Sequence, residues 1–148
     1  MSTIISSNQA QKVAPISKLW WVGLVAASGA AIANLILFLI TRGLGIPYIM
    51  PLQGPDAMLE ALPASMVVIA SVVPAIAATI LFAILGKFLA QPIRVFWIIA
   101  TVFLVISLAA PLTLPAAVAL STKIGLTLMH VVAGATIVGI LTTLGREQ

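Results

Sequence analysis

The stretch LWWVGLVAASGAAIANLILFLIT, residues 19–41, decides the fold, because it runs for 23 residues without a charged side chain. At 1.5 Å per residue a helix of this length covers about 34 Å, enough to cross a hydrocarbon core of ~30 Å with some tilt. The run continues unbroken to Ile40, further than the apolar region of a secretory signal peptide needs. A membrane-spanning helix is therefore favoured over a cleaved leader.

Three further apolar runs follow, at residues 64–86, 93–110 and 124–144. The chain is 62% hydrophobic and only 7% charged, whereas soluble domains carry roughly a quarter charged residues. We therefore expect an all-α polytopic membrane protein, with one domain of four transmembrane helices in an up-down bundle over residues 19–144. Residues 1–18 are polar and are expected to form a flexible or surface-lying tail, and residues 145–148 a second, short tail.

The connections between the apolar runs are rich in proline. Residues 43–63 hold four of the nine prolines and two of the three acidic residues, and Asp56 is expected to cap a short interfacial turn that reaches Leu62. Residues 112–123 are expected to form a re-entering or interfacial hairpin. Pro74 lies near the middle of the second run and predicts a kink in that helix.

The basic residues indicate the orientation of the bundle. Four spans bring both termini to one side, where five basic residues fall: Lys12, Lys18, Lys87, Arg94 and Arg146. Only Arg42 and Lys123 fall on the other side. The positive-inside rule then predicts cytoplasmic N and C termini in a bacterial cytoplasmic membrane. Interfacial aromatic rings are expected on the terminal side at Trp20, Trp21 and Trp97, and on the other side at Tyr48.

Three polar residues are predicted to share one layer of the outer leaflet. Asn34, Ser71 and His130 each lie about seven residues from the outer end of their run, which places them ~10 Å below the membrane boundary. Thr127 belongs to the His130 stripe, because Lys123, Thr127 and His130 are spaced i, i+4, i+7.

This polar layer has two interpretations. In the first, Asn34 and His130 are interhelical hydrogen-bond partners that fix the register of the bundle, each worth about 0.5–1.5 kcal/mol. In the second, the layer is a pocket that opens outward, with His130 near its floor and Lys123 at its mouth. His130 could then titrate, or hold an anionic or hydrogen-bonding ligand.

The sequence contains little that could carry catalysis. There is no cysteine and one histidine, which excludes disulfides, thiolate sites and Cys/His zinc sites. The three carboxylates, Asp56, Glu60 and Glu147, lie outside the apolar runs, and Asp56 and Glu60 would share a helix face at i, i+4. We therefore expect no enzyme, no cofactor and no metal site. The basic residues at membrane boundaries reflect topology, so nucleic acid is not expected as a partner.

Small residues recur at helical spacing on the first and last runs, at Gly23, Ala27 and Ala31 and at Ala135, Gly139 and Thr143. Such stripes either close the protein's own bundle or seat the helix of another protein. Closure within the chain is the default for four spans with short loops. A partner membrane protein or a homo-oligomer remains an alternative, in addition to the lipid bilayer itself.

Several short segments resemble a family of small bacterial four-helix membrane proteins catalogued as a domain of unknown function. These segments are Leu19-Trp20-Trp21, Ala33-Asn34, Ser71-Val72-Val73-Pro74, Pro92-Ile93-Arg94-Val95-Phe96 and the stretch LTLMHVVAG at 126–134. The resemblance covers about residues 19–144, implies the four-span fold and implies no activity. It makes Asn34, Pro74 and His130 the positions to test.

Two functions are consistent with these features. The favoured one is a non-enzymatic accessory or scaffolding membrane subunit, because the helices are rich in packing residues and hold no buried charge pair. The alternative is a small permease or ligand-binding membrane protein that uses the layer of Asn34, Ser71 and His130. A water-accessible cavity would support the alternative, and a closed bundle with His130 bonded to Asn34 would oppose it.

Overall fold

The computed structural model describes residues 12–54 and 56–147. This part of the chain forms five helices and two short strands: α1 (Ile16–Gly43), β1 (Ile49–Pro51), β2 (Leu59–Ala61), α2 (Ala64–Phe88), α3 (Pro92–Ser107), α4 (Ala109–Leu112) and α5 (Leu120–Leu144). Because α4 continues α3 after Leu108, four helical spans are long and apolar enough to cross a membrane. The predicted four-helix membrane fold is confirmed.

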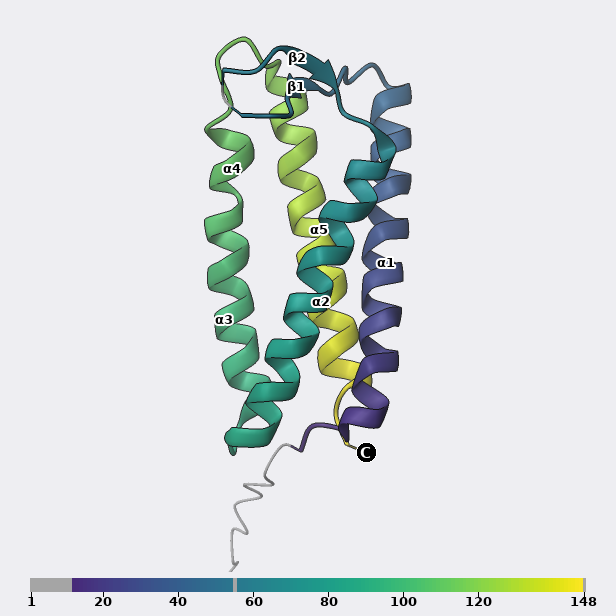
Figure 1. The fold of residues 1–148 in the computed structure, drawn as a ribbon, viewed down its shortest axis with the longest axis vertical. Helices are drawn as coiled ribbons and strands as arrows, with labels where there is room; N and C mark the ends of the chain where they lie inside the picture. Colours follow the sequence, from purple (N-terminus) through teal and green to yellow (C-terminus); the bar gives the residue numbers. More distant parts are fainter. Residues whose placement is uncertain (1–11, 55, 148) are drawn as a thin grey trace, which may run out of the picture.

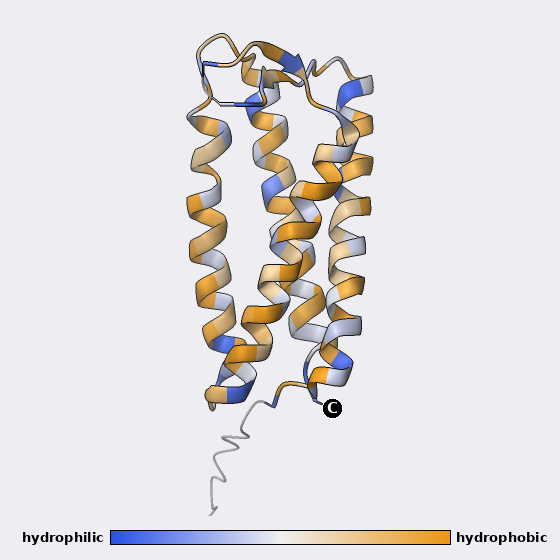
Figure 2. Ribbon diagram, in the orientation of Figure 1, coloured by the Kyte–Doolittle hydropathy of each residue, from blue (hydrophilic) through white to orange (hydrophobic). Residues whose placement is uncertain are grey.

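The four spans stand as a bundle in which α2 crosses diagonally (Figure 1). The start of α2 packs beside α1, whereas its end leads through a short turn into α3. Both α1 and α2 also contact α5. The blue, hydrophilic residues gather mostly at the two ends of the bundle, and orange residues cover the length of the helices (Figure 2). These features indicate a multi-pass membrane protein.

The helix boundaries extend beyond the apolar runs. α1 begins at Ile16 and α5 at Leu120, before the predicted starts at residues 19 and 124, because a membrane helix continues into its polar flank. The third span reaches Leu112 through α4. The hairpin predicted for residues 112–123 is therefore wrong, since that segment is divided between the ends of two helices and the turn that joins them.

The connection between α1 and α2 is a β-hairpin and not a helical turn. β1 and β2 pair antiparallel, with Ile49 opposite Ala61 and Met50 opposite Glu60. The prediction that Asp56 caps a helical turn, with Glu60 on the same helix face, is wrong. Backbone pairing satisfies the peptide groups of this proline-rich segment more fully than one isolated turn would.

Tyr48 secures the hairpin to the bundle. Its side chain is fully buried, its ring centroid lies 5.0 Å from that of Phe38, and it packs against Gly125, which has no side chain to obstruct it. The Thr41 hydroxyl donates to the Leu37 carbonyl, so the Tyr48 hydroxyl donates to Thr41 Oγ1 at 2.7 Å. Tyr48 thus lies at the hairpin end of the bundle, but its ring is buried in the protein and is not exposed at the membrane interface. Trp20, Trp21 and Trp97 do lie exposed.

The two ends of the chain meet at the opposite end of the bundle. Val13 and Arg146 form an antiparallel bridge, in which Ala14 N–H donates to the Gly145 carbonyl and Glu147 N–H donates to the Lys12 carbonyl, both at 2.9 Å. Residues 12–15 are therefore held against the bundle and the helix begins at Ile16, so the predicted flexible tail does not extend to residue 18. The rest of that predicted tail, residues 1–11, lies outside the described residues.

Candidate functional site

A cleft of about 1080 Å³ lies between α2, α3 and α5. In α2 its lining residues run from Met66 to Leu81, which covers about 22 Å of the helix. Facing residues come from α3 and α4, from Phe96 to Pro111, and from α5, from Leu126 to Val138. This volume is just above the usual range of small-molecule sites, roughly 300–1,000 Å³. The cleft therefore has room for a whole ligand and is much larger than a packing defect.

The cleft opens sideways between α2 and α3. Ile69 and Val73 of α2 line it and are 59% and 60% exposed, and Phe103 of α3 lines it and is 68% exposed. Such apolar, exposed rims would face lipid tails in a membrane. The diagonal course of α2 explains the opening, because α2 and α3 are joined at one end and separate toward the hairpin (Figure 1).

The wall of the cleft is almost entirely apolar. Within the described part of the chain, three of the lining side chains carry a nitrogen or oxygen atom, namely Asn34, Ser107 and His130. No Lys, Arg, Asp or Glu of these described residues lines the cleft. Ser107 donates its hydroxyl hydrogen to the Leu104 carbonyl of its own helix at 2.7 Å. Asn34 and His130 are therefore the polar groups that remain to be explained.

Asn34 is joined to α2 but keeps one unused acceptor. Its Nδ2 donates to Ser71 Oγ at 3.0 Å, and the Ser71 hydroxyl donates to the Val67 carbonyl at 2.8 Å. Because the only hydroxyl hydrogen of Ser71 is used, Asn34 must donate to it, and this fixes the amide with Oδ1 on the other side. Oδ1 has no partner among residues 12–54 and 56–147, although Asn34 is only 5% exposed.

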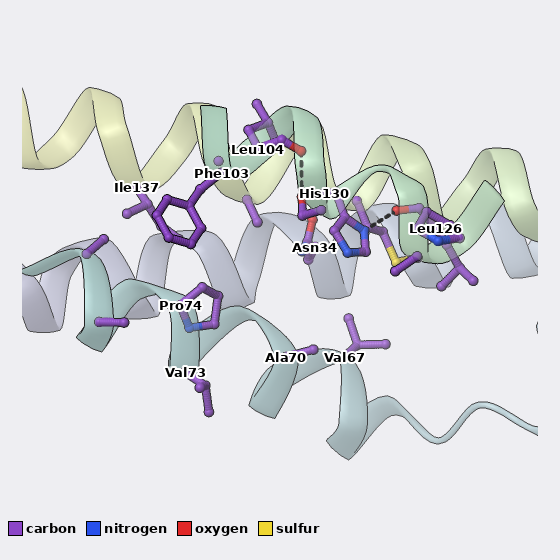
Figure 3. Close-up of a pocket in the computed structure, with 18 of the residues that line it drawn as sticks. Asn34, Val67, Ala70, Val73, Pro74, Phe103, Leu104, Leu126, His130 and Ile137 are labelled. Carbon is purple, nitrogen blue, oxygen red and sulfur yellow. Dashed lines mark hydrogen bonds between the residues drawn. The ribbon is translucent and has the colours of Figure 1, made fainter. Parts of the chain in front are cut away.

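His130 presents its ring to the cleft. Its Nδ1 lies 2.8 Å from the Leu126 carbonyl oxygen, which can only accept, so Nδ1 carries a hydrogen. In the neutral ring Nε2 is then an acceptor. The ring extends from α5 toward α2, with Val67 and Ala70 across the cleft and Asn34 at a neighbouring level (Figure 3).

The polar layer thus combines parts of both sequence interpretations. Asn34 and Ser71 meet, as their common depth implied, but His130 bonds within its own helix. The hypothesis that Asn34 and His130 are direct hydrogen-bond partners is wrong in this structure. The closed bundle that would have opposed a pocket is not what the described residues form.

Thr127 and Lys123 lie outside this cleft. The Thr127 hydroxyl donates to the Lys123 carbonyl at 2.8 Å, and Lys123 Nζ donates to the Leu114 carbonyl at 2.6 Å. Lys123 thereby ties α5 to the turn after α4 and does not line the cleft. Leu114 itself lines the cleft, so the place of Lys123 at the mouth of a pocket stays a prediction.

Pro74 lies within an unbroken α2 and lines the cleft opposite Phe103 (Figure 3). Proline has no N–H, so the carbonyl of Ala70 lacks its usual helical donor four residues later. Ala70 also lines the cleft. The residue predicted to bend α2 therefore belongs to the same wall as the polar layer.

The two small-residue stripes differ in what they face. A Cβ at Gly23 would lie 2.7 Å from Thr79 Cγ2, so this stripe closes the contact between α1 and α2. A Cβ at Gly139 would meet nothing within 4 Å, and Ala135 and Thr143 are exposed. The stripe on α5 therefore points away from the bundle.

Most of the lining residues were missed from the sequence, among them Phe103 and Ser107. A hydroxyl inside the third apolar run was a usable signal for Ser107, since the same reasoning selected Ser71. Phe103 gave none, because an aromatic residue in an apolar run has no distinguishing pattern. Among the described residues, no group of three His, Cys, Asp or Glu side chains is close enough to hold a metal ion.

Comparison with known proteins identifies a family. A family model described as a family of unknown function (DUF6069) matches residues 14–147. No curated protein and no solved structure matches the chain.

Proposed function

We propose that this chain, which belongs to the family of unknown function DUF6069, is a membrane protein that binds a lipophilic molecule in the cleft between α2, α3 and α5. One observation carries the proposal: a cleft of about 1080 Å³, walled by apolar side chains, contains a layer of polar groups that are not fully paired. Binding sites combine a large apolar wall with a few placed polar groups in this way.

The position of the opening supports entry from the membrane. Ile69, Val73 and Phe103 would be in contact with acyl chains, so a lipophilic molecule could pass sideways into the cleft without crossing water. A polar solute would have to leave water to reach the same place, at a cost of several kcal/mol. We propose binding without catalysis, because Ser107, the one hydroxyl that lines the cleft in the described part of the chain, donates to the Leu104 carbonyl and not to His130.

We also propose that the protein lies in a bacterial cytoplasmic membrane with both termini in the cytoplasm. The charge distribution supports this orientation, since by the bounds of the helices Lys18, Lys87, Arg94 and Arg146 lie at the terminal end of the bundle and Arg42 and Lys123 at the hairpin end. The resemblance to small bacterial membrane proteins supports the choice of membrane.

An accessory or scaffolding subunit is the second candidate. The feature that favours it is the outward stripe of Ala135, Gly139 and Thr143 on α5, because small residues allow close helix approach. The cleft favours ligand binding more strongly, since a subunit that only packs against a partner gains nothing from a large unfilled space within its own bundle.

Thermal unfolding of the purified protein in mild detergent tests ligand binding. Octadecyl methyl ether, a long apolar chain without a hydrogen-bond donor, is the probe, at a fixed mole fraction in the micelles. A ligand that binds the folded state raises the midpoint of unfolding with concentration. We expect a saturable rise for the wild type.

Ala70→Phe provides the matched variant, because Ala70 lines the cleft and is exposed there. The larger side chain should fill the cleft and abolish the rise, whereas Ala135→Phe on the outward face of α5 should retain it. An equal rise in all three proteins would indicate a general effect of the ether on the micelle and would overturn the proposal.

A further inference from the structure

We infer that the ligand is an uncharged lipophile that bears a hydrogen-bond donor, such as a hydroxyl group, whose hydrogen is shared between Asn34 Oδ1 and His130 Nε2 in a three-centre hydrogen bond. The inference rests on the proposed function and specifies the chemistry of the ligand in the same cleft. It is carried by two acceptors that the described residues leave without donors.

Asn34 supplies the first acceptor. A buried carbonyl-type oxygen without a hydrogen bond costs about 1–3 kcal/mol, so proteins rarely leave one unpaired. Ser71 cannot rotate to satisfy Oδ1, because its hydroxyl hydrogen is engaged by the Val67 carbonyl. A molecule in the cleft that Asn34 lines can supply the missing donor.

His130 supplies the second acceptor. The Leu126 carbonyl holds the hydrogen on Nδ1, which leaves the Nε2 lone pair of the neutral ring free to accept. The ring projects into the cleft beside Asn34 (Figure 3). A ligand in this position thus meets two acceptors and no free side-chain donor from the polar residues that line the wall, since Ser107 also donates to its own helix.

The surroundings exclude a charged head group. An ionised group in an apolar site costs several kcal/mol unless an opposite charge pairs with it. No Lys, Arg, Asp or Glu of the described residues lines the cleft, and Lys123 is bonded to the Leu114 carbonyl. The anionic ligand considered from the sequence is therefore replaced by a neutral donor.

The same chemistry occurs in two kinds of molecule, a free long-chain alcohol and a neutral membrane lipid with one hydroxyl. The experiment uses octadecanol for the first and dioleoylglycerol for the second, beside octadecyl methyl ether. Apparent dissociation constants are obtained from the unfolding midpoint as a function of ligand concentration. A preference between octadecanol and dioleoylglycerol separates the two sources, and either preference agrees with the inference.

We expect octadecanol to bind the wild type about tenfold or more tightly than its methyl ether. The ratio should fall in Asn34→Leu and in His130→Phe, because each variant removes one of the two acceptors and leaves the apolar wall. Because Asn34→Leu also breaks the bond to Ser71 and so affects folding, His130→Phe is the second variant that keeps the test decisive.

The outcomes separate this inference from the proposed function. Equal binding of the alcohol and the ether to the wild type would overturn the inference and leave a lipophile-binding cleft in place. Failure of all three probes to bind would overturn the proposed function. A tenfold ratio that persists in both variants would assign the hydroxyl to other residues and would also overturn the inference.

Discussion

The amide of Asn34 on α1 donates to the hydroxyl of Ser71 on α2 at 3.0 Å, and this bond turns the Asn34 carbonyl oxygen away from every donor in the described part of the chain. One interhelical bond thus does two things. It fixes the register of α1 against α2, and it leaves an acceptor at the cleft. The packing of α1 against α2 and the proposed binding of a ligand therefore both depend on the bond between Asn34 and Ser71.

Ser71→Ala tests the structural half of this relationship. The change removes the acceptor of the Asn34 amide, and an interhelical hydrogen bond of this kind contributes about 0.6 kcal/mol, up to ~1.7. We expect the free energy of unfolding, measured by titration with a denaturing detergent, to fall by about that amount. Ser65→Ala, at an exposed position of the same helix, is the control and should change nothing. Identical stability of the two variants would show that the bond is not formed.

Gly23→Ala should destabilise the contact between α1 and α2. The new Cβ would lie within 2.8 Å of two Thr79 side-chain atoms, and the Thr79 hydroxyl is held by the Ala75 carbonyl. Overpacking of this kind costs about 1–3 kcal/mol. Gly139→Ala is the matched control, because its Cβ meets nothing within 4 Å. If Gly139→Ala were the more damaging change in purified monomer, the assignment of the inner and outer stripes would be wrong.

Tyr48→Phe should weaken the attachment of the hairpin. The variant keeps the ring between Phe38 and Gly125 but loses the bond to Thr41, which is worth about 1 kcal/mol. Tyr48→Ala also empties the ring site and should cost roughly 3–5 kcal/mol. Met58→Ala, on the same connection and 83% exposed, should be neutral. Chemical unfolding measures all three, and a neutral Tyr48→Ala would contradict the role of this ring.

The orientation can be tested with single cysteines, because the chain contains none of its own. Lys12→Cys and Gln53→Cys introduce exposed thiols at the terminal and hairpin ends. In intact cells stripped of any outer barrier, a membrane-impermeant maleimide should label Gln53→Cys, and should label Lys12→Cys only after lysis. The reverse pattern would show that the positive-inside rule fails for this protein.

The sequence was sufficient to predict the spans, because a helix that crosses lipid must be long, apolar and internally hydrogen-bonded, and each requirement is visible in residues 19–41. The hairpin was not predictable from the same signals. Strands β1 and β2 are three residues each, and Tyr48 adopts a φ of 47° that its burial against Phe38 and Gly125 stabilises. Both depend on contacts between distant segments.

The candidate site was predictable only in part. Depth along the helices placed Asn34 and Ser71 at one level, and they do bond. Depth does not specify how a helix is rotated about its axis or which rotamer a side chain adopts. It therefore could not show that His130 bonds the Leu126 carbonyl of its own helix and not Asn34. The cleft itself follows from the diagonal course of α2, which results from the packing of all four spans and leaves no local pattern.

Native mass spectrometry of the protein extracted from its own membranes in mild detergent shows whether the cleft holds a lipophile. We predict a monomer that carries one bound, uncharged lipophilic molecule with a hydroxyl or similar donor. Ala70→Phe, prepared in parallel, should lose that molecule, and Ala135→Phe should keep it. A wild-type chain that carries no such molecule, with another protein chain or a second copy bound in constant ratio instead, would contradict the account and would favour the accessory subunit.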